Sequence, residues 1–303
     1  MELIYKVMPK DYKLVHASDL HYGPMCCFKE GIQDMVDYVK THDDVYLWFS
    51  GDAIDAILPN DKRYAHCGMD RAEWLMSPQD QADKVIEVFE PIKERILGWQ
   101  LGNHEYTVIN SFDVAKYICK ELEVPWGGVS AKFIARHPNN KPAHKFFFMH
   151  GKKIFNSQAK DPIQAPANQQ AALKKYFENT KHTDCVYMGM GHGHKDILVE
   201  PTVGNEIMLT DDGNGELDQE DRFSVEQTAK YIPPECRWYA MSPGFLKTYT
   251  PSGQFAISYS EIAGYGPTRL GFNILKVVDS KLVDVRIIDS AEFHKTGKLD
   301  RRG

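Results

Sequence analysis

Five short polar clusters in the sequence combine the side chains that bind divalent metal ions. The clusters are Asp19-Leu20-His21, Asp52 to Asp55, Asn103-His104-Glu105, His150-Gly151 and His192-Gly193-His194. Carboxylate, imidazole and amide oxygen, with no thiolate among them, suit Mn, Fe, Zn, Ni or Co. In the first and last clusters, the i, i+2 spacing directs both side chains to one face of an extended segment. The sequence therefore predicts a metal centre whose ligands are far apart along the chain.

Each polar cluster follows an apolar run that is rich in β-forming residues. The strands expected before the clusters are Lys13–Ala17, Val45–Phe49, Leu97–Leu101, Lys145–Met149 and Cys185–Met188. Runs such as VYLWF and KFFFM are nearly continuous, which is typical of strands covered on both faces. Ligands of open α/β sheets bind beyond the carboxyl ends of the strands, so we expect all five clusters to converge on one site.

Helical patterns lie between these strands. Residues 31–40 carry an apolar stripe with i, i+3, i+4, i+7 spacing, and residues 80–97 carry another that Pro91 kinks or interrupts. Ser111 is the expected N-cap of a helix that runs to about Leu122. Shorter strands are expected in the last third of the chain, at Ile197–Glu200, Glu206–Leu209, Phe255–Tyr259, Phe272–Val278 and Leu282–Ile288.

The order of these elements predicts an α/β fold, a mixed β-sandwich flanked by helices. We find no flexible linker and no internal repeat, so we expect one domain over residues 1–303. Its core motifs span residues 19–194, and a β-rich part spans residues 195–290.

Composition excludes several classes of protein. Of the 303 residues, 43% are hydrophobic and 26% are charged, and no apolar run approaches the ~20 residues of a membrane span. The first residues lack the apolar stretch of a secretory signal, and the six cysteines form no CxxC pair. We therefore expect a cytoplasmic protein with reduced thiols and no membrane partner. The net charge of −6 argues against general electrostatic binding of nucleic acid.

The motif order DxH, GDxxD, GNHE, H and GHxH resembles the calcineurin-like metallophosphoesterase superfamily, over residues 19–194. The resemblance implies four αββα layers and two divalent metal ions, with Mn expected ahead of Fe, Zn, Ni or Co. The implied ligands of the first metal are Asp19, His21, Asp52 and His194. The implied ligands of the second metal are Asp52, Asn103, His150 and His192. His104 would be the general acid, and Glu105 and Asp55 would orient imidazoles.

Fewer sequence features identify His150 than identify the other ligands. Only the strand before it and the glycine after it mark its position. His137 and His144 are rivals for this position, but both precede the apolar strand instead of following it.

The reaction implied by the resemblance is phosphoester hydrolysis by a metal-activated hydroxide. Protein Ser/Thr phosphatases share GNHE but have arginines after the second and third motifs, where this chain has Ala56-Ile57 and Tyr106-Thr107. We therefore expect a phosphodiesterase that acts on a nucleotide-type substrate. The alternatives are a DNA or RNA nuclease, a phosphomonoesterase acting on a protein or a small molecule, and a non-catalytic binding scaffold.

Two later segments bear on the substrate. Residues 242–249, with Ser258-Tyr259 and residues 264–267, resemble metallophosphoesterases of phages and prophages, and Lys247 and Tyr265 could pair with or stack on a nucleotide. Residues 201–226 hold eight acidic residues against one basic residue, and their run of acids fails the spacing of an EF-hand. We expect an acidic, solvated loop at residues 211–216. No heptad pattern indicates an oligomeric state.

Overall fold

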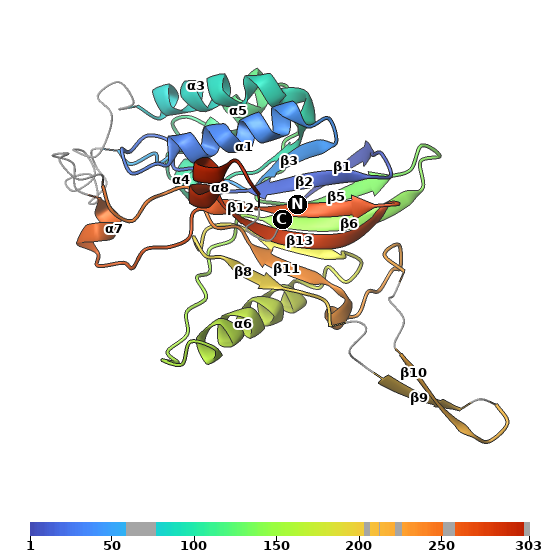
Figure 1. Cartoon of the computed structure of the whole chain (residues 1–303). Helices are drawn as coiled ribbons and strands as arrows, with labels where there is room; N and C mark the ends of the chain where they lie inside the picture. The colour runs from blue at the N-terminus through green and yellow to red at the C-terminus, as the bar shows by residue number, and fades with distance from the viewer. Residues whose placement is uncertain (59–76, 203–206, 212, 222–225, 251–257, 300–303) are drawn as a thin grey trace.

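The computed structural model describes all residues except 59–76, 203–206, 212, 222–225, 251–257 and 300–303. Two β-sheets pack face to face, with α1, α3 and α5 on one outer face and α6 on the other (Figure 1). The expected fold class, a mixed β-sandwich flanked by helices in αββα layers, is confirmed.

One sheet has five strands in the order β13-β12-β2-β3-β4. Their bounds are Tyr12–Ala17 for β2, Val45–Phe49 for β3, Ile96–Trp99 for β4, Gly271–Val278 for β12 and Lys281–Asp289 for β13. β2, β3 and β4 are parallel, so their carboxyl ends lie at one edge, while β12 is antiparallel to both β2 and β13. The strands predicted in this sheet are confirmed to within about two residues at each end.

The other sheet has six strands in the order β1-β5-β6-β7-β11-β8. Their bounds are Glu2–Val7 for β1, Ser130–Arg136 for β5, Pro142–Met149 for β6, Tyr187–Met190 for β7, Ile197–Val199 for β8 and Trp238–Met241 for β11. β6, β7 and β11 are parallel. The strand predicted at 185–188 begins two residues later. β1, β5 and β11 were not predicted, because β1 lies mostly exposed at the sheet edge, lysine interrupts β5 and β11 is short.

The helices differ from their predicted bounds where backbone chemistry overrides the apolar stripe. Their bounds are Lys29–Thr41 for α1, Pro78–Phe89 for α3, Asn103–Val108 for α4, Val114–Glu121 for α5, Gln164–Thr180 for α6, Tyr259–Ile262 for α7 and Ser290–Thr296 for α8. Pro91 ends regular helix as expected, because 3₁₀ turns cover Glu90–Arg95, but residues 96 and 97 belong to β4. Another 3₁₀ turn spans Pro234–Cys236.

Two local predictions were wrong, and the predictions for the acidic segment were confirmed only in part. Asp113, not Ser111, caps α5, because its carboxylate accepts a hydrogen bond from the backbone of Lys116. Tyr259 begins a helix instead of ending a strand, while residues 255–257 of that predicted strand lie outside the described residues. The strand predicted at Glu206–Leu209 is β9, Ile207–Asp211, which pairs antiparallel with the unpredicted strand β10, Leu217–Asp221. Residues 213–216 of the predicted acidic loop lie between these strands, and the hairpin projects from the sandwich in Figure 1.

The interior is filled by three apolar clusters, one between the sheets and one beneath each helical layer. Between the sheets, the rings of Trp48 and Phe148 stack with centroids 4.5 Å apart, which joins β3 to β6. Burial of such large aromatic surfaces is the main force that holds the two sheets together. Among the described residues, no helix has both the length and the apolar character to cross a membrane.

Candidate metal centre

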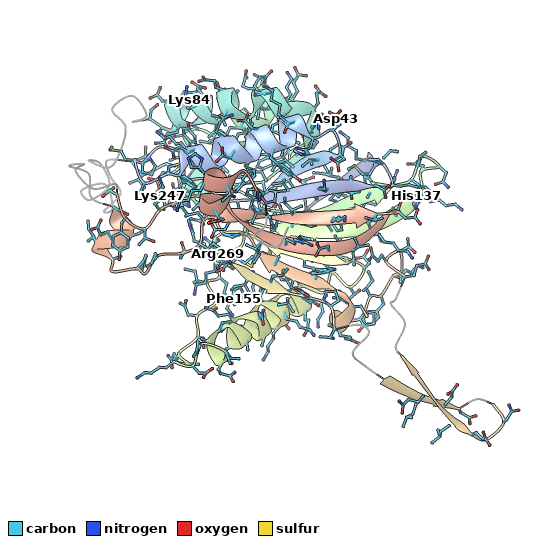
Figure 2. All side chains as sticks on the ribbon, viewed as in Figure 1. Asp43, Lys84, His137, Phe155, Lys247 and Arg269 are labelled. Carbon is cyan, nitrogen blue, oxygen red and sulfur yellow. The ribbon has the colours of Figure 1, made fainter. Side chains whose placement is uncertain are left out.

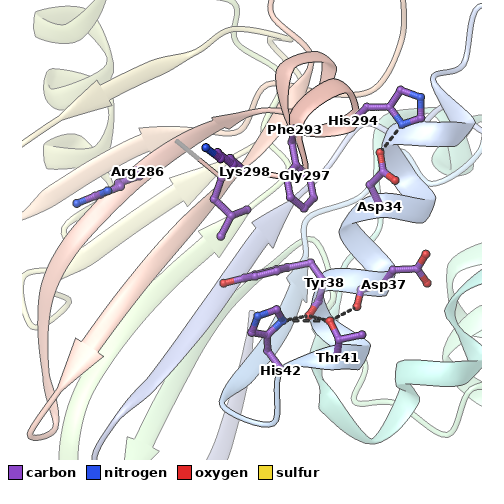
Figure 3. A pocket seen from close by; sticks show the side chains of 11 residues that line it. Asp34, Asp37, Tyr38, Thr41, His42, Arg286, Phe293, His294, Gly297 and Lys298 are labelled. Carbon is purple, nitrogen blue, oxygen red and sulfur yellow. Dashed lines mark hydrogen bonds and ion pairs between the residues drawn. The ribbon is translucent and has the colours of Figure 1, made fainter. Parts of the chain in front are cut away.

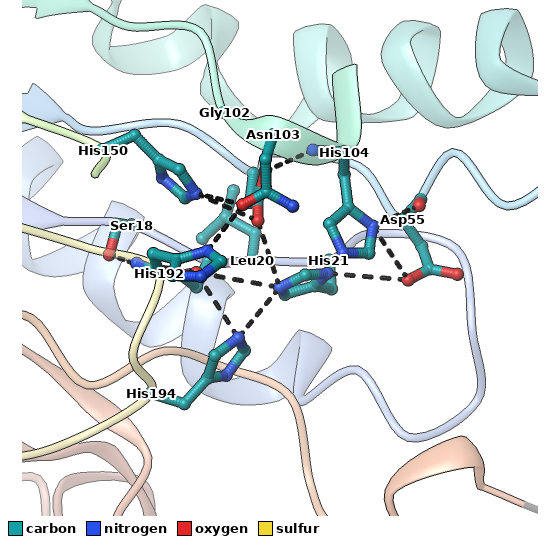
Figure 4. Close-up of polar contacts among 12 residues, drawn as sticks. Ser18, Leu20, His21, Asp55, Gly102, Asn103, His104, His150, His192 and His194 are labelled. Carbon is teal, nitrogen blue, oxygen red and sulfur yellow. Dashed lines mark hydrogen bonds and ion pairs between the residues drawn. The ribbon is translucent and has the colours of Figure 1, made fainter. Parts of the chain in front are cut away.

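The polar clusters of the sequence meet at one end of the sandwich, and they come from both sheets. Asp19 and His21 follow β2, Asp52 follows β3, and Asn103 begins α4 just after β4. His150 follows β6 in the other sheet, and the remaining two ligands follow β7. Figure 4 shows the imidazoles of these loops pointing toward a common centre. The structure thus brings together all seven side chains that the resemblance assigned to the metals.

Three groups of side chains place potential ligand atoms within 4.8 Å of one another. The groups are Asp19, His21 and His194; Asp52, His150 and His192; and His21, Asp52 and His104. The first group contains three of the four ligands implied for the first metal, and the second contains three of the four implied for the second metal. The third group shows that His104 lies against the same centre, with its ring edge on to that of His21 at a centroid distance of 4.5 Å.

In the second group, imidazole nitrogens face oxygens at close range. His150 Nε2 lies 3.2 Å from Asp52 Oδ2 and 2.9 Å from Asn103 Oδ1. His192 Nδ1 lies 2.6 Å from the same Asn103 oxygen. Asn103 Oδ1 therefore lies between two imidazoles, close enough to both to bind the same metal ion with them.

In the first group, His21 lies between the two carboxylates. Its Nε2 is 3.8 Å from Asp19 Oδ1 and 3.8 Å from Asp52 Oδ2, and His194 Nε2 is 3.4 Å from Asp19 Oδ1. The Nε2 atoms of His21 and His194 are 3.1 Å apart. Three potential ligand atoms thus lie within 3.8 Å of His21 Nε2.

The backbone of this site is held in an uncommon conformation. Five of the seven expected ligands have positive φ angles, namely Asp19 at 56°, His21 at 47°, Asp52 at 55°, His192 at 68° and His194 at 48°. Non-glycine residues rarely adopt this left-handed region, and such strain concentrates at functional sites. The i, i+2 ligand pairs are therefore not in regular extended strands, contrary to the expectation from their spacing.

Main-chain hydrogen bonds tie the ligand loops together. The N–H of Asp19 donates to the carbonyl of Gly51 at 2.9 Å, and the N–H of His21 donates to the carbonyl of Asp52 at 3.1 Å. Gly51 and Gly102 make this approach feasible, because a Cβ on Gly102 would lie 2.1 Å from both the backbone nitrogen and Oδ1 of Asp52.

Glu105 holds the Asp52 loop from beneath. Its buried carboxylate accepts hydrogen bonds from the backbone N–H groups of Asp52, Ala53 and Gly102, at 3.2, 2.5 and 3.0 Å. Burial, followed by the nearby charge of Asp52, raises the pKa of Glu105 to about 7. Glu105 was expected to orient an imidazole, but its carboxylate accepts its hydrogen bonds from main-chain amides.

Asp55 does lie against imidazoles, as expected. Its Oδ1 is 3.5 Å from His21 Nδ1 and 3.6 Å from His104 Nδ1, and its carbonyl oxygen accepts a hydrogen bond of 2.5 Å from His104 Nδ1. With Nδ1 engaged, Nε2 is the nitrogen that His104 can offer to another group.

The tautomer of His150 is set by a residue that the sequence did not indicate. His150 Nδ1 donates to the carbonyl oxygen of Ser50 at 2.7 Å, so Nε2 is left to face the centre. The Ser50 hydroxyl in turn joins a buried network with His16, at 3.0 Å, and Gln100, at 3.0 Å. His16 also bonds Tyr187 at 2.8 Å, which links the two sheets below the site.

Residues beyond β11 also support the site, although no pattern in the sequence predicted this role for them. The N–H of Phe245 donates to the carbonyl of Asp19 at 2.9 Å, and a Cβ on Gly244 would lie 2.9 Å from that of Asp19 and 3.1 Å from His194 Nδ1. Ser18 donates to the Asp19 carboxylate from the adjacent position. Small residues next to a ligand are the one sequence feature that points to such close packing.

Pairing decides the charge of the buried ligands. Burial disfavours the ionised form of Asp19, but His194 and other imidazoles beside it lower its pKa to about 2. Burial disfavours protonation of His21 and His150, but the carboxylates of Asp19 and Asp52 respectively raise their pKa values to about 10 and about 9. For His194, burial prevails and lowers the pKa to about 4.

The donor set fits divalent cations. His150 Nε2 faces two oxygens that can only accept a hydrogen bond, so this position requires either a proton or a metal ion between them. Among the described residues, the cations recorded within 4 Å of the buried Asp19 and Asp52 carboxylates are all histidines. Two buried carboxylates without a lysine or arginine partner are a typical metal-binding arrangement.

The rival histidines lie elsewhere. His137 is in the turn between β5 and β6, at the end of β6 opposite His150 (Figure 2). His144 points between the sheets, where its nitrogens contact the hydroxyl of Tyr12 at 2.6 Å and the carbonyl of Ser280 at 2.9 Å. Lys247, a candidate nucleotide contact, packs its ammonium group 4.6 Å from the ring centroid of Phe28.

Two cavities among the described residues bear on function. The larger, of about 680 Å³, lies between α1 and α8, where Asp34, Tyr38 and His294 are among its lining residues (Figure 3), and it includes none of the candidate ligands. The smaller, of about 380 Å³, is lined in part by Asn103 and His150 and is therefore continuous with the metal centre.

No protein-family model matches the chain, and no curated protein matches it. Solved structures to which it is similar include a metallophosphoesterase from Sphaerobacter thermophilus, at 11% identity and a TM-score of 0.40, with 94% of each chain covered. A calcineurin-like phosphoesterase from Bacillus subtilis is similar at 12% identity and a TM-score of 0.36, with 93% of this chain and 91% of that chain covered. An NAD nucleotidase from Haemophilus influenzae is similar at 12% identity and a TM-score of 0.38, with 92% of this chain and 49% of that chain covered. At such low values the activity has to be inferred from the chemistry of the site.

Proposed function

We propose that this chain is a two-metal phosphoesterase of the calcineurin-like metallophosphoesterase superfamily, and that it hydrolyses a nucleotide-type phosphodiester. The observation that carries the proposal is the meeting of two ligand groups at Asp52. One group contains Asp19, His21 and His194, and the other contains His150 and His192, with Asn103 Oδ1 between them.

Two divalent cations held by these groups would supply an activated water and would neutralise charge on the phosphoryl oxygens. Mn²⁺ is the proposed metal, because oxygen and imidazole ligands without thiolate accommodate it. The protein supplies the rest. Glu105 and Ser50 hold the ligands in place, and His104 gives a proton to the leaving group from Nε2 while Asp55 retains Nδ1.

A diester is favoured over a monoester by the charges near the site. A phosphomonoester carries up to two negative charges, which phosphatases commonly grip with the bidentate fork of arginine. The second and third motifs are followed here by Ala56 and Tyr106, which offer no such grip. A diester carries a single negative charge, which the metal ions alone can balance.

The test separates His104 from the metal ligands. His104→Ala is expected to keep two metal ions per chain, measured by inductively coupled plasma mass spectrometry, and to lose about 10²- to 10⁴-fold in kcat on bis-p-nitrophenyl phosphate. His150→Ala is expected to lose metal as well as activity. The wild type is expected to turn over the diester bis-p-nitrophenyl phosphate much faster than the monoester p-nitrophenyl phosphate.

Three results would contradict parts of this proposal. Loss of metal from His104→Ala would make His104 a ligand, as its group with His21 and Asp52 permits. Faster turnover of the monoester would exclude the diesterase assignment. A metal-loaded wild type that hydrolyses neither ester would leave a binding scaffold, and efficient cleavage of long DNA or RNA would identify a nuclease.

A further inference from the structure

The cavity of about 380 Å³ beside the metal centre has walls that suit a flat, apolar ligand. Its lining residues include the aromatic Tyr106 and Tyr176 and the apolar Leu101, Val129 and Met149. Ligand-binding pockets of proteins typically have volumes of about 300–1,000 Å³ and predominantly apolar walls with a few polar groups. Its size and lining therefore match a site for a small molecule.

Two of the lining residues remain exposed although they are large and apolar. Tyr106 is 57% exposed and Val129 is 57% exposed. Tyr176 is held in place more firmly, because its hydroxyl contacts the sulfur of Met149 at 3.9 Å and its ring packs on Phe155 with centroids 5.6 Å apart. Adjacent exposed apolar surfaces in a cavity mark a site that gains stability when a ligand covers them.

The helix α4 couples this cavity to the metal centre. Asn103 and Tyr106 are three residues apart on that helix and so lie on the same face, and both line the cavity. His104, the next residue after Asn103, is directed instead toward Asp55 and His21 and does not line the cavity. The cavity thus opens on the side of Asn103 and His150, away from the proposed acid.

We propose that this cavity binds the nucleoside that stays attached to the phosphate, with Tyr106 and Tyr176 supplying the aromatic faces for its base. The inference rests on the proposed function, because it places the leaving group on the side of His104 and the retained ester group on the side of Asn103. Lys152, which also lines the cavity and has Nζ 5.6 Å from the centroid of the Tyr106 ring, adds a positive charge beside an anionic substrate.

Two diesters with the same leaving group test the assignment. Thymidine 5′-(p-nitrophenyl phosphate) carries a nucleoside on the retained side, and methyl p-nitrophenyl phosphate carries only a methyl group there. Tyr106→Ala is expected to lower kcat/KM for the thymidine ester by about 5- to 150-fold, through KM, because one base–aromatic stacking contact is lost. The methyl ester is expected to be hydrolysed as by the wild type.

Two control variants accompany Tyr106→Ala. Tyr106→Phe keeps the aromatic face and is expected to retain the wild-type KM for the thymidine ester. Tyr231→Ala removes a tyrosine of matched environment, since Tyr231 is 59% exposed and has the Arg237 guanidinium 5.8 Å from its ring centroid, but it is outside the cavity. It is expected to leave both esters unaffected.

Thymidine alone provides a readout that needs neither metal nor turnover. Its binding, followed by saturation-transfer-difference NMR at millimolar concentration, is expected for the wild type and lost in Tyr106→Ala. Equal effects of Tyr106→Ala on both esters, or a thymidine signal that is absent from the wild type or survives in Tyr106→Ala, would overturn the inference. Failure of the wild type to hydrolyse either ester would reject the proposed function. Thymidine binding would then show by itself whether the cavity binds a nucleoside.

Discussion

At the scale of single residues, the ligands depend on main-chain geometry more than on one another. Asp19, His21 and Asp52 all have left-handed backbone conformations, which cost free energy unless the surroundings fix them. Glu105 provides part of that restraint, because its carboxylate accepts hydrogen bonds from consecutive amides of the Asp52 loop. The resemblance implied a supporting role for Glu105, but only the folded loop shows that it supports the backbone of the Asp52 loop.

Glu105→Gln is therefore expected to reduce the free energy of unfolding. An amide side chain turns one N–H₂ group toward backbone donors, so charge-assisted hydrogen bonds worth about 1.5–3 kcal/mol are lost. Urea unfolding at pH 8, above the pKa of about 7 at which the Glu105 carboxyl ionises, measures the effect. Glu121→Gln on the exposed side of α5 is the control, and equal stability of the two variants would contradict the role given to Glu105.

At the scale of elements, strand positions followed from apolar runs, while helix ends followed from capping that the sequence left ambiguous. Both Ser111 and Asp113 precede the apolar stripe of α5, and both residue types cap helices. In the structure, Asp113 has the non-helical backbone and accepts the hydrogen bond from Lys116. When two residues of capping type lie two positions apart, only the path of the chain before the helix decides which of them is the N-cap.

This difference predicts unequal effects of two alanine substitutions. Asp113→Ala is expected to lower the free energy of unfolding by about 1 kcal/mol, the usual value of an N-cap. Ser111→Ala, at an exposed position in the preceding turn, is expected to change it by less than about 0.5 kcal/mol. Urea midpoints of the two variants compare them directly. A larger loss in Ser111→Ala would restore the cap that the sequence suggested.

At the scale of the whole molecule, the candidate metal centre joins the two sheets. Asp19, His21 and Asp52 extend from the five-stranded sheet, and His150 and His192 extend from the six-stranded sheet. A cation shared by both sets would link these loops directly. Metal should therefore stabilise the fold as well as supply the chemistry.

Chelation is expected to lower the melting temperature. A ligand that binds only the folded state adds about 2.7 kcal/mol when its concentration is one hundred times its Kd, so removing the metal reverses this gain. Differential scanning calorimetry of EDTA-treated and Mn²⁺-reloaded protein measures the shift. Asp52→Asn alters the ligand that is common to both sets, so its melting temperature should change less between the EDTA-treated and the Mn²⁺-reloaded protein. Identical melting temperatures with and without metal would contradict a centre that links the sheets.

A second link between the sheets predicts a dependence on pH. Burial lowers the pKa of His144 to about 4, since its imidazole lies between β6 and the residues Tyr12 and Ser280. The folded state keeps His144 neutral, while the unfolded state takes up a proton near pH 6.5. The associated stability is therefore complete above pH 6.5 and is lost as the pH falls toward 4, by about 3 kcal/mol in all.

His144→Gln should remove this contribution to acid sensitivity. The variant is less stable at pH 7.5 because it loses contacts, but its unfolding free energy should fall less steeply between pH 6.5 and 4.5. Urea unfolding at several pH values provides the slopes. His42→Gln, at an exposed position, should keep the wild-type slope. An unchanged slope in His144→Gln would show that other groups control acid unfolding.

The sequence by itself determined which residues form the candidate centre and that strands deliver them, because metal-binding side chains after apolar runs remain recognisable without neighbours. It also indicated a mixed sandwich, since continuous apolar strands must be covered on both faces. Only the tertiary structure decided that the five strand ends belong to two sheets, because strand pairing depends on contacts across long sequence separations. The same holds for the left-handed backbone at Asp19 and Asp52, the carbonyl of Ser50 behind His150, and the cavity beside Tyr106. Each of these features arises where segments that are distant in the sequence pack together, and local sequence patterns do not predict such contacts.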